Sequence, residues 1–348
     1  MHLYTSTITT LFLSLSLPYT TQAWGSLGHR TVAYLASLYF TPRSTTFTNH
    51  LLNGQDISEA ALFPDKVRHM PAFAYTAAWH YIDAQDDPPR QCGINVTRDC
   101  LAADGGCVVS AIANHTARVA DLSLPRFYRG QSLRFMMHFF GDVHQPLHTE
   151  NLSRGGNDIP VLFDNHATNL HSVWDTLIPN KYAGPDTLSQ SHRHSEPSSS
   201  SRPSSSSPSY APTMYDHDDE LLAAFRWAQR LYSQDAQDDT HTSSSSVSNE
   251  CLSDATECSL SWASEANSHV CSYVLAHDVL HQELGGTYYE GAVPIIDDLV
   301  GKAGRRLAAW INTITNNIDD MDLADNQKTV EYMRNNEAGS GLSQHLLE

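Results

Sequence analysis

Two histidine–aspartate pairs in this chain have the spacing of metal ligands on a helix. His138 and Asp142 are four residues apart, and so are His171 and Asp175. Residues four apart share one face of an α-helix, so each imidazole and carboxylate can reach a common ion. Either pair alone is more often a salt bridge on a helix surface. Two such pairs, with His148 between them, indicate a metal site, and this ligand set suits zinc.

Further ligand candidates lie nearer the N-terminus. His80 follows Asp65 by fifteen residues in a segment rich in Ala, Tyr and Trp, and taken alone it is typical of a hydrogen-bonded core histidine. His29 follows Trp24 by five residues, with two glycines between them that permit a tight turn. If Trp24 began the mature chain, its α-amine would titrate at about pH 8. A metal ion could then displace the proton and bind the nitrogen. Without processing, Trp24 is better explained as a buried aromatic anchor.

The first 23 residues have the features of a secretory signal peptide. An apolar, hydroxyl-rich stretch ends in Thr21-Gln22-Ala23, a small-x-small cleavage signature. The segment has no Lys or Arg, the first being Arg30, so an uncleaved anchor is the alternative. The apolar stretch is too short and too polar to span a membrane. We therefore predict a signal peptide over residues 1–23 and a mature chain that begins at Trp24.

The cysteines and glycosylation motifs agree with an extracellular location. An even number of cysteines behind a signal peptide predicts disulfides in an oxidising compartment. Two close pairs could close small loops and leave one long-range link: Cys100–Cys107, Cys251–Cys258 and Cys92–Cys271. Three sequons, each weak alone, would become glycosylation sites on such a chain. They begin at Asn95, Asn114 and Asn151.

The acidic composition limits how this protein can bind phosphates. The formal net charge is −18, which disfavours a protein that grips nucleic acid with many Lys and Arg side chains. Any phosphate binding must therefore be local, and bound zinc would supply positive charge where it is needed. Most of the acidic residues are explained as well by solubility.

Hydrophobic periodicity predicts a mainly helical protein. The expected helices cover residues 28–40, 108–124, 133–143, 221–231, 260–279 and 294–314. Pro294 would occupy a first turn, where its missing N–H costs nothing. Only residues 159–163 and the flank of His80-Tyr81-Ile82 have the character of strands. We expect an all-α fold with a minor β element.

Composition also marks segments that should lie outside the core. Residues 189–209 are Ser/Pro-rich and residues 240–248 are Ser-rich; such compositions cannot bury a core and predict disordered insertions. The polar residues 316–348 predict a loose tail. A single domain over residues 24–315 is therefore expected.

Together these motifs resemble a known family, the secreted zinc-dependent nucleases of fungi and plants called nuclease S-one and nuclease P-one. The resemblance covers most of residues 24–315. The matching blocks are Trp24-Gly25-x-x-Gly28-His29, Asp65, His80-Tyr81-Ile82-Asp83, His138-x-x-Gly141-Asp142, Gln145-Pro146-Leu147-His148, Gly155-Gly156-Asn157, Asn169-Leu170-His171-x-x-Trp174-Asp175 and Trp310-Ile311-Asn312. The resemblance implies a single, mainly helical domain of the phospholipase C and P-one nuclease type, with a trinuclear zinc site at the base of a cleft.

The resemblance also implies how the ligands divide among the zinc ions. One ion would take Asp65, His80, His138 and Asp142; the second His148, His171 and Asp175; the third the amine and carbonyl of Trp24, His29 and a shared Asp142. The implied reaction is attack of zinc-activated hydroxide on phosphorus, which leaves 5′-phosphate products. Asp65 and Arg68 would belong to the catalytic machinery, Arg68 as a basic residue near the phosphate. The alternative for Arg68 is a surface charge.

Specificity for single strands is expected from a base-stacking site, since a base locked in a duplex cannot offer its face to an aromatic ring. Tyr81 is the candidate platform, and the resemblance assigns base hydrogen bonds to Asp83 and Asn169. Packing and helix capping are the alternatives for Tyr81 and Asn169. The implied substrates are single-stranded DNA, RNA and 3′-nucleotides, cut by a monomeric endonuclease and 3′-nucleotidase without stable membrane association.

Two competing functions fit the same ligands. A bacterial zinc phospholipase C uses a similar trinuclear site, so the ligands alone do not choose between lipid and nucleic acid. The chain could also be a catalytically silent, secreted zinc-binding effector. Against the silent effector, three zinc ions with open positions exceed what folding needs. Tyr81, Asp83 and Asn169 favour the nuclease over the phospholipase.

Overall fold

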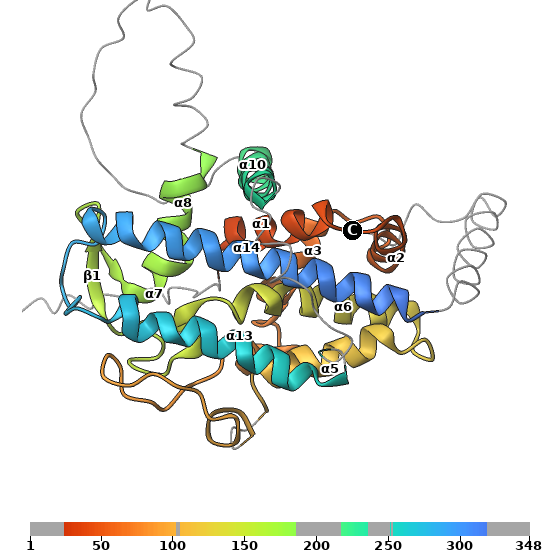
Figure 1. Ribbon diagram of the computed structural model, residues 1–348, viewed down its shortest axis with the longest axis horizontal. Coiled ribbons are helices and arrows are strands. Elements are labelled where there is room, and N and C mark those ends of the chain that lie inside the picture. The colour runs from red at the N-terminus through yellow and green to blue at the C-terminus, as the bar shows by residue number, and fades with distance from the viewer. Residues whose placement is uncertain (1–23, 102–104, 186–216, 236–250, 252, 319–348) are drawn as a thin grey trace, which may run out of the picture.

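The computed structural model describes residues 24–101, 105–185, 217–235, 251 and 253–318. The predicted signal peptide, both Ser-rich insertions and all but the start of the predicted tail lie outside these residues. The described chain is helical with one small two-stranded sheet (Figure 1), which confirms the predicted fold class.

The first helices bring the N-terminal ligand candidates into the core. α1 (Ser26–Leu38) buries Leu27, Val32 and Leu35 on one face, and it packs against α3, α10 and α14. The helices that follow are short: α2 (Pro42–Leu52), α3 (Ile57–Ala61), α4 (Phe63–Val67) and the 3-10 helix η1 (Ala74–His80). Thr41 and Asp56 begin α2 and α3 as N-caps, since their side chains accept backbone N–H bonds.

α6 (Arg126–Asp142) is the central helix and lies beside α5 (Val108–Ala120). Its C-terminal half, from Phe135 to Asp142, is buried on every side, as expected of a helix in a protein core. The helix starts seven residues before the predicted start at residue 133. The prediction missed the first turns because they carry exposed Phe127 and Tyr128, which obscure the helical spacing of the buried apolar residues. A π-helical turn, η2 (Thr97–Leu101), precedes α5.

Two C-terminal helices form a scaffold along the molecule (Figure 1). α13 (Ala255–His269) continues into the π-helical η5 (Val270–Val274), so this predicted helix ends five residues before residue 279. α14 (Thr287–Asn316) contains Pro294 inside it, not in its first turn as predicted. Its earlier residues stay helical because Ala292 is fully buried and Tyr288 is tied to Trp174, whose Nε1 donates to the Tyr288 hydroxyl at 2.9 Å.

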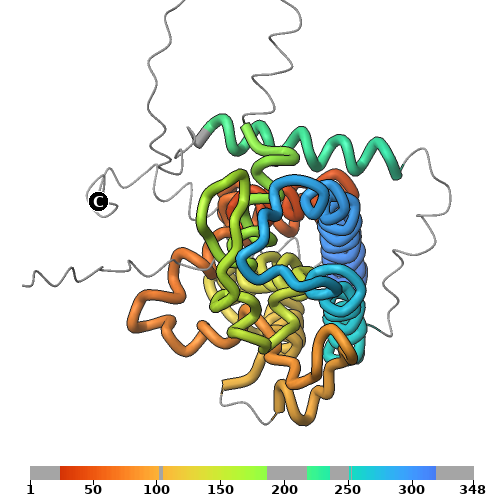
Figure 2. Tube along the Cα trace, turned by 90° about the vertical axis from the view of Figure 1, so that its left-hand side faces the viewer, coloured from red at the N-terminus to blue at the C-terminus, as the bar shows by residue number. Residues whose placement is uncertain are grey.

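α10 (His217–Asp235) crosses one face of the molecule, as Figure 2 shows in green. The Arg30 guanidinium of α1 contacts Glu220 of α10 at 2.8 Å. At the other side, Trp227 Nε1 donates to Asp297 of α14 at 2.6 Å. α10 is therefore joined to both the first and the last helix of the described chain.

The sheet consists of β1 (Pro160–Phe163) and β2 (His166–Asn169), paired antiparallel with Phe163 opposite His166. The two-residue loop has positive φ at both positions, the geometry of tight hairpins. β1 was predicted and β2 was not, while the flank of His80-Tyr81-Ile82 forms no strand in the described chain. Tyr81 is extended and its neighbour Ile82 donates to the carbonyl of His148, yet this contact is a single bond and not a ladder.

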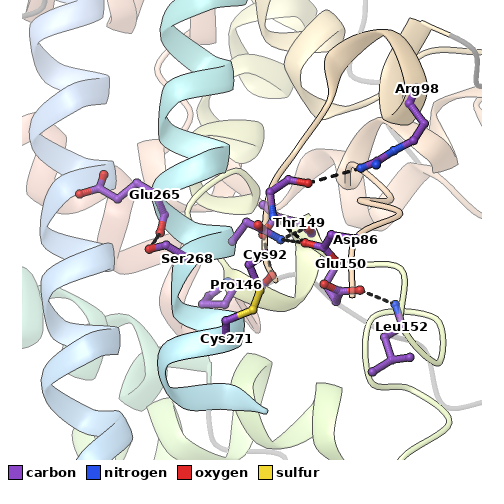
Figure 3. The surroundings of a disulfide bond; sticks show 12 residues. Asp86, Cys92, Arg98, Pro146, Thr149, Glu150, Leu152, Glu265, Ser268 and Cys271 are labelled. Carbon is purple, nitrogen blue, oxygen red and sulfur yellow. Dashed lines mark hydrogen bonds between the residues drawn. A yellow bond between two sulfur atoms is a disulfide. The ribbon is translucent and has the colours of Figure 1, made fainter. Parts of the chain in front are cut away.

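The short elements after α6 are η3 (Pro146–Thr149), α7 (Leu170–Ser172), the π-helical η4 (Val173–Leu177) and α8 (Ile178–Ala183). All six cysteines are paired in the structure as Cys92–Cys271, Cys100–Cys107 and Cys251–Cys258. Cys92–Cys271 joins the loop before η2 to η5, beside Thr149 and Glu150 (Figure 3).

Candidate metal centre

The floor of the site is built around the last turn of α6. His138 and Asp142 point the same way, with 3.4 Å between His138 Nε2 and Asp142 Oδ2. His80, at the end of η1, brings its Nδ1 to 3.1 Å from the same carboxylate oxygen. Asp65 of α4 lies 3.7 Å from both imidazoles. Asp65, His80 and His138 are all buried and form one group with the geometry to hold an ion.

A second group forms where η3 meets α7 and η4. His171 Nε2 lies 2.9 Å from Asp175 Oδ2, and the rings of His148 and His171 stack with 5.2 Å between centroids. Asp175 lies in the π-helical turn η4, which is wider than an α-helical turn. His171 and Asp175 nevertheless lie on the same face of the helix, as their spacing of four residues predicts. Gln145 Nε2 donates to Asp175 Oδ1, which leaves Oδ2 directed at His171. These three ligand candidates also form a metal-binding group.

A third group joins α1 to α6. His29 Nε2 lies 3.4 Å from Asp142 Oδ1, and its ring stacks on His138 at 3.8 Å. Only glycine fits at position 141, because a Cβ there would lie 2.6 Å from His29 Nδ1. His138 is thus within reach of His29 and of Asp65, so it is shared between two groups. Asp142 also lies close to both groups, through His29 and His80.

The resemblance adds the main chain of Trp24 to this third group. Its side chain is fully buried, and the next residue, Gly25, donates its N–H to the carbonyl of Asp175 at 2.6 Å. The main chain at Trp24 is therefore held between His29, five residues on, and the segment that carries Asp175.

Backbone carbonyls orient three of the imidazoles. A ring nitrogen bonded to a carbonyl carries the proton, which leaves the other nitrogen as the metal donor. The bonded atoms are His138 Nδ1 with the oxygen of Ala61 at 2.8 Å, His148 Nδ1 with His80 at 2.7 Å, and His171 Nδ1 with Gly155 at 2.6 Å. In each case Nε2 is free to face the group.

The electrostatics of the site favour a bound cation. Burial raises the pKa of Asp65 to about 7, although Arg68 lowers it and Asp175 raises it further. Burial, with Asp65 as a neighbour, raises the pKa of Asp142 well above its usual range. Within the described residues, neither oxygen of Asp142 has a hydrogen-bond donor. A buried carboxylate without donors is costly unless a cation balances it.

The histidines point to the same conclusion. Burial lowers the pKa of His80 and of His138 well below the usual range, so both rings are neutral and able to donate a lone pair. Neutral imidazoles with carboxylates are the borderline ligand set that zinc prefers. The three groups therefore fit the three zinc ions that the resemblance implies.

A cleft of about 470 Å³ opens above these groups. His80, His148 and His171 reach its floor, and the candidate substrate residues Arg68, Tyr81 and Asp83 line it. The Arg68 side chain is 10% exposed, with Nε 3.5 Å from Asp65 Oδ1. Arg68 is therefore a mostly buried cation at the cleft and not a surface charge.

Asn169 does not line this cleft. Its side chain accepts the N–H of Ser172 at 2.8 Å and caps α7, which is the alternative that the sequence left open. Asn157 lines the cleft instead, together with Arg154 and His69. Asn157 follows two glycines in a block that the resemblance already contained, so its position was the signal that could have found it.

The geometry defines a class: a helical protein with a buried, multinuclear histidine–aspartate centre beneath a cleft. Comparison with known proteins then gives the family. The profile of the S1/P1 nuclease family matches residues 24–316, and the chain belongs to this family. It is accordingly a nuclease, an enzyme that hydrolyses nucleic acid.

Similar proteins occur in fungi and in plants. Nuclease S1 of Aspergillus oryzae is 34% identical over 308 residues, which cover 86% of this chain and 95% of that protein. Nuclease P1 of Penicillium citrinum is 34% identical over 299 residues, with 84% and 97% covered. Endonuclease 4 of Arabidopsis thaliana is 28% identical over 303 residues, with 84% and 89% covered.

Proposed function

We propose that the protein is a secreted endonuclease that hydrolyses single-stranded DNA and RNA to 5′-phosphate products, and that it also removes the phosphate of 3′-nucleotides. The observation that carries this proposal is the shared cleft. A half-exposed aromatic ring, Tyr81, and a carboxyl group, Asp83, line the same cleft as the buried imidazoles of His80, His148 and His171. A base and its phosphate could thus be held at once.

The proposed ligands are those of the three groups, with the main chain of Trp24 added to His29 and Asp142. Zinc bound there would neutralise phosphate charge and lower the pKa of water toward neutrality. Asp65 would remain ionised once it faces a cation. Arg68, whose guanidinium is held near Asp65, would donate charge-assisted hydrogen bonds to the phosphate oxygens.

Base recognition is proposed at Tyr81 and Asp83. Tyr81 is 38% exposed, so one ring face is open for stacking while the chain on either side is fixed. Its backbone carbonyl accepts from Val108, and Ile82 donates to His148. Burial and Asp99 raise the pKa of Asp83, which favours a carboxyl group able to pair with a base edge. A stacked base must leave its duplex, so single strands are the proposed substrate.

A substrate panel tests this function. The zinc-loaded protein should cut single-stranded DNA and RNA much faster than duplex DNA, release phosphate from 3′-nucleotides and leave phosphatidylcholine micelles intact. Lipid cleavage without nucleotide release would assign the phospholipase function. Full zinc with no hydrolysis of any substrate would assign the silent effector.

A matched pair of variants tests the base site. Tyr81→Ala should lose single-strand preference through a higher KM, by about 5- to 150-fold for a stacking loss of about 1–3 kcal/mol. Tyr75→Ala is the control, because Tyr75 is an exposed tyrosine that does not line the cleft among the described residues. Equal effects of both changes would remove the stacking role.

Secretion, processing and assembly complete the proposal. Three disulfides favour an oxidising compartment, and no helix in the described ranges is both long and apolar enough to cross a bilayer. We propose a signal peptide over residues 1–23, a nuclease domain over 24–315, a tail over 316–348 and a monomer. Asn95, Asn114 and Asn151 are all exposed, as glycosylation requires. N-terminal sequencing and sedimentation of the secreted protein test these assignments.

A further inference from the structure

One of the three sequons lies on the rim of the cleft. Asn151, which begins Asn151-Leu152-Ser153, is exposed and lines the same cleft as Tyr81 and His148. Asn95 and Asn114 are also exposed but are not among the described residues that line it. The three sequons therefore differ in what an attached sugar would meet.

The backbone fixes the position of Asn151. Its N–H donates to the carbonyl of Ala84 at 3.3 Å, and its carbonyl accepts from Arg154 at 2.9 Å. Ala84 directly follows Asp83, so the sequon is joined to the segment proposed to bind the base. The next N–H, that of Leu152, donates to buried Glu150 at 2.6 Å (Figure 3).

The turn that follows is equally constrained. Four consecutive residues, 153–156, have positive φ, and two of them, Ser153 and Arg154, are not glycine. Such a left-handed turn persists only where its surroundings hold it. A sugar attached at Asn151 would thus stay at the rim, since its point of attachment cannot swing away from the cleft.

The Asn151 side chain is available for attachment, because it makes no hydrogen bond within the described residues. We propose that Asn151 carries an N-linked glycan that narrows the cleft and selects small substrates over polymers. Nδ2 would lose a proton and bond to the anomeric carbon of an oligosaccharide lipid diphosphate, whose carbon–oxygen bond breaks as the diphosphate leaves. This inference rests on the proposed function, since it assumes both secretion and nuclease activity.

The selectivity follows from the shape of the cleft. Arg68 and Tyr81 line it together with Asn151, Arg154 and Asn157. A 3′-nucleotide brings only one base and one phosphate into the cleft. A polymer must also continue out of the cleft, where a bulky, hydrated glycan at the rim competes for the same space.

The test begins with the protein secreted by a glycosylating host. Peptide mass spectrometry should find Asn151 occupied. The variant Ser153→Asn removes the sequon, retains Asn151 and suits the positive φ at this position, which asparagine tolerates well. It should cleave long single-stranded DNA several-fold faster than the wild type, with an unchanged rate on a 3′-nucleotide. Asn114→Gln, on the exposed face of α5, removes a remote sequon and should change neither rate.

A second measurement uses the wild-type protein and needs no substitution. Trimming the wild-type glycans with an endoglycosidase that leaves one sugar should raise the polymer rate in the same direction. An unoccupied Asn151, or a polymer-to-nucleotide ratio equal in all forms, would overturn the proposal. Absence of both activities from every zinc-loaded form would overturn the proposed function itself, and this inference with it.

Discussion

The N–H of Gly25 donates a hydrogen bond to the carbonyl oxygen of Asp175, with 2.6 Å between the two atoms. This bond joins the start of the described chain to a segment that carries a metal-ligand candidate. Only glycine fits there, because a Cβ at position 25 would lie 2.8 Å from the Thr176 hydroxyl. The main chain of Trp24 is consequently held beside the ligand groups.

From this relationship we predict that the mature chain must begin at Trp24, with no residue ahead of it. A protein with one extra residue ahead of Trp24 loses the α-amine as a ligand, and zinc affinity at the third group should fall by at least about tenfold. Zinc counting by mass spectrometry and turnover on single-stranded DNA measure the effect. Full zinc and normal turnover in the extended protein would remove Trp24 from the ligand set.

His171→Ala should lower the zinc content by one ion per chain. The change takes one of three ligand candidates from the second group, and His148 and Asp175 alone are too few for a stable zinc site. His277→Ala is the control, because His277 is exposed and belongs to none of the described ligand groups. An unchanged metal count in His171→Ala would exclude the ligand role.

Gly141→Ala should disable the third group. Replacing glycine by alanine within a helix normally stabilises it by about 1 kcal/mol, but here the new methyl group would meet the His29 ring at 2.6 Å. We expect displacement of His29, loss of zinc and loss of activity. Gly93→Ala, where nothing lies within 4 Å of the added Cβ, should behave as the wild type. A zinc-replete, active Gly141→Ala protein would show that the ring can move aside.

Asn169 and Asn157 should have different roles, Asn169 in stability and Asn157 in substrate binding. Asn169→Ala removes the cap of α7 and should cost about 1 kcal/mol of stability with an unchanged KM. Asn157→Ala should raise the KM for nucleotides, because Asn157 lines the cleft, with a smaller effect on stability. Urea denaturation and steady-state kinetics measure both. The opposite pattern would return Asn169 to the base site.

Glu265 should make the scaffold sensitive to acid. Burial alone would raise its pKa, but hydrogen bonds from Lys302 and Arg306 lower it to about 2. A carboxyl group with a depressed folded-state pKa stabilises the protein above its usual pKa of 4.5 and loses that effect as the pH falls toward 2. Because Glu265 lies on α13 and its partners Lys302 and Arg306 lie on α14, these ion pairs stabilise the packing of the two helices.

The corresponding measurement compares Glu265→Gln with the wild type in chelator, so that zinc loss does not interfere. The difference in unfolding free energy should be largest above pH 4.5 and should shrink as the pH falls. Glu290→Gln, at an exposed position, should keep the wild-type profile. A difference that stays constant with pH would mean that the Glu265 carboxylate does not act through its charge.

Local spacing predicted those parts of the site that lie within one element. His138 and Asp142 are one turn apart on α6, so the sequence alone placed them together. Their meeting with His29 depends on the packing of α1 against α6, which no local pattern contains, and only the family resemblance supplied it.

The errors have the same origin. The β2 strand has exposed residues at its start and lacks the apolar alternation that marks a half-buried strand, so its pairing with β1 was not visible. Pro294 indicated a helix start, but burial of Ala292 carries α14 beyond it. Asn169 is two residues before the ligand candidate His171, and its side chain caps α7, the alternative that the sequence left open. Adjacency along the chain does not determine which way a side chain points.

The order of the elements along the chain has a consequence for biogenesis. Every proposed ligand precedes α8, whereas α1, which carries His29, packs against α14 at the far end of the described chain. A nascent polypeptide still lacking its last helix would contain all the donors without the support that aligns them. We therefore expect the ligand groups to align only after the last helix has been synthesised and packed against α1.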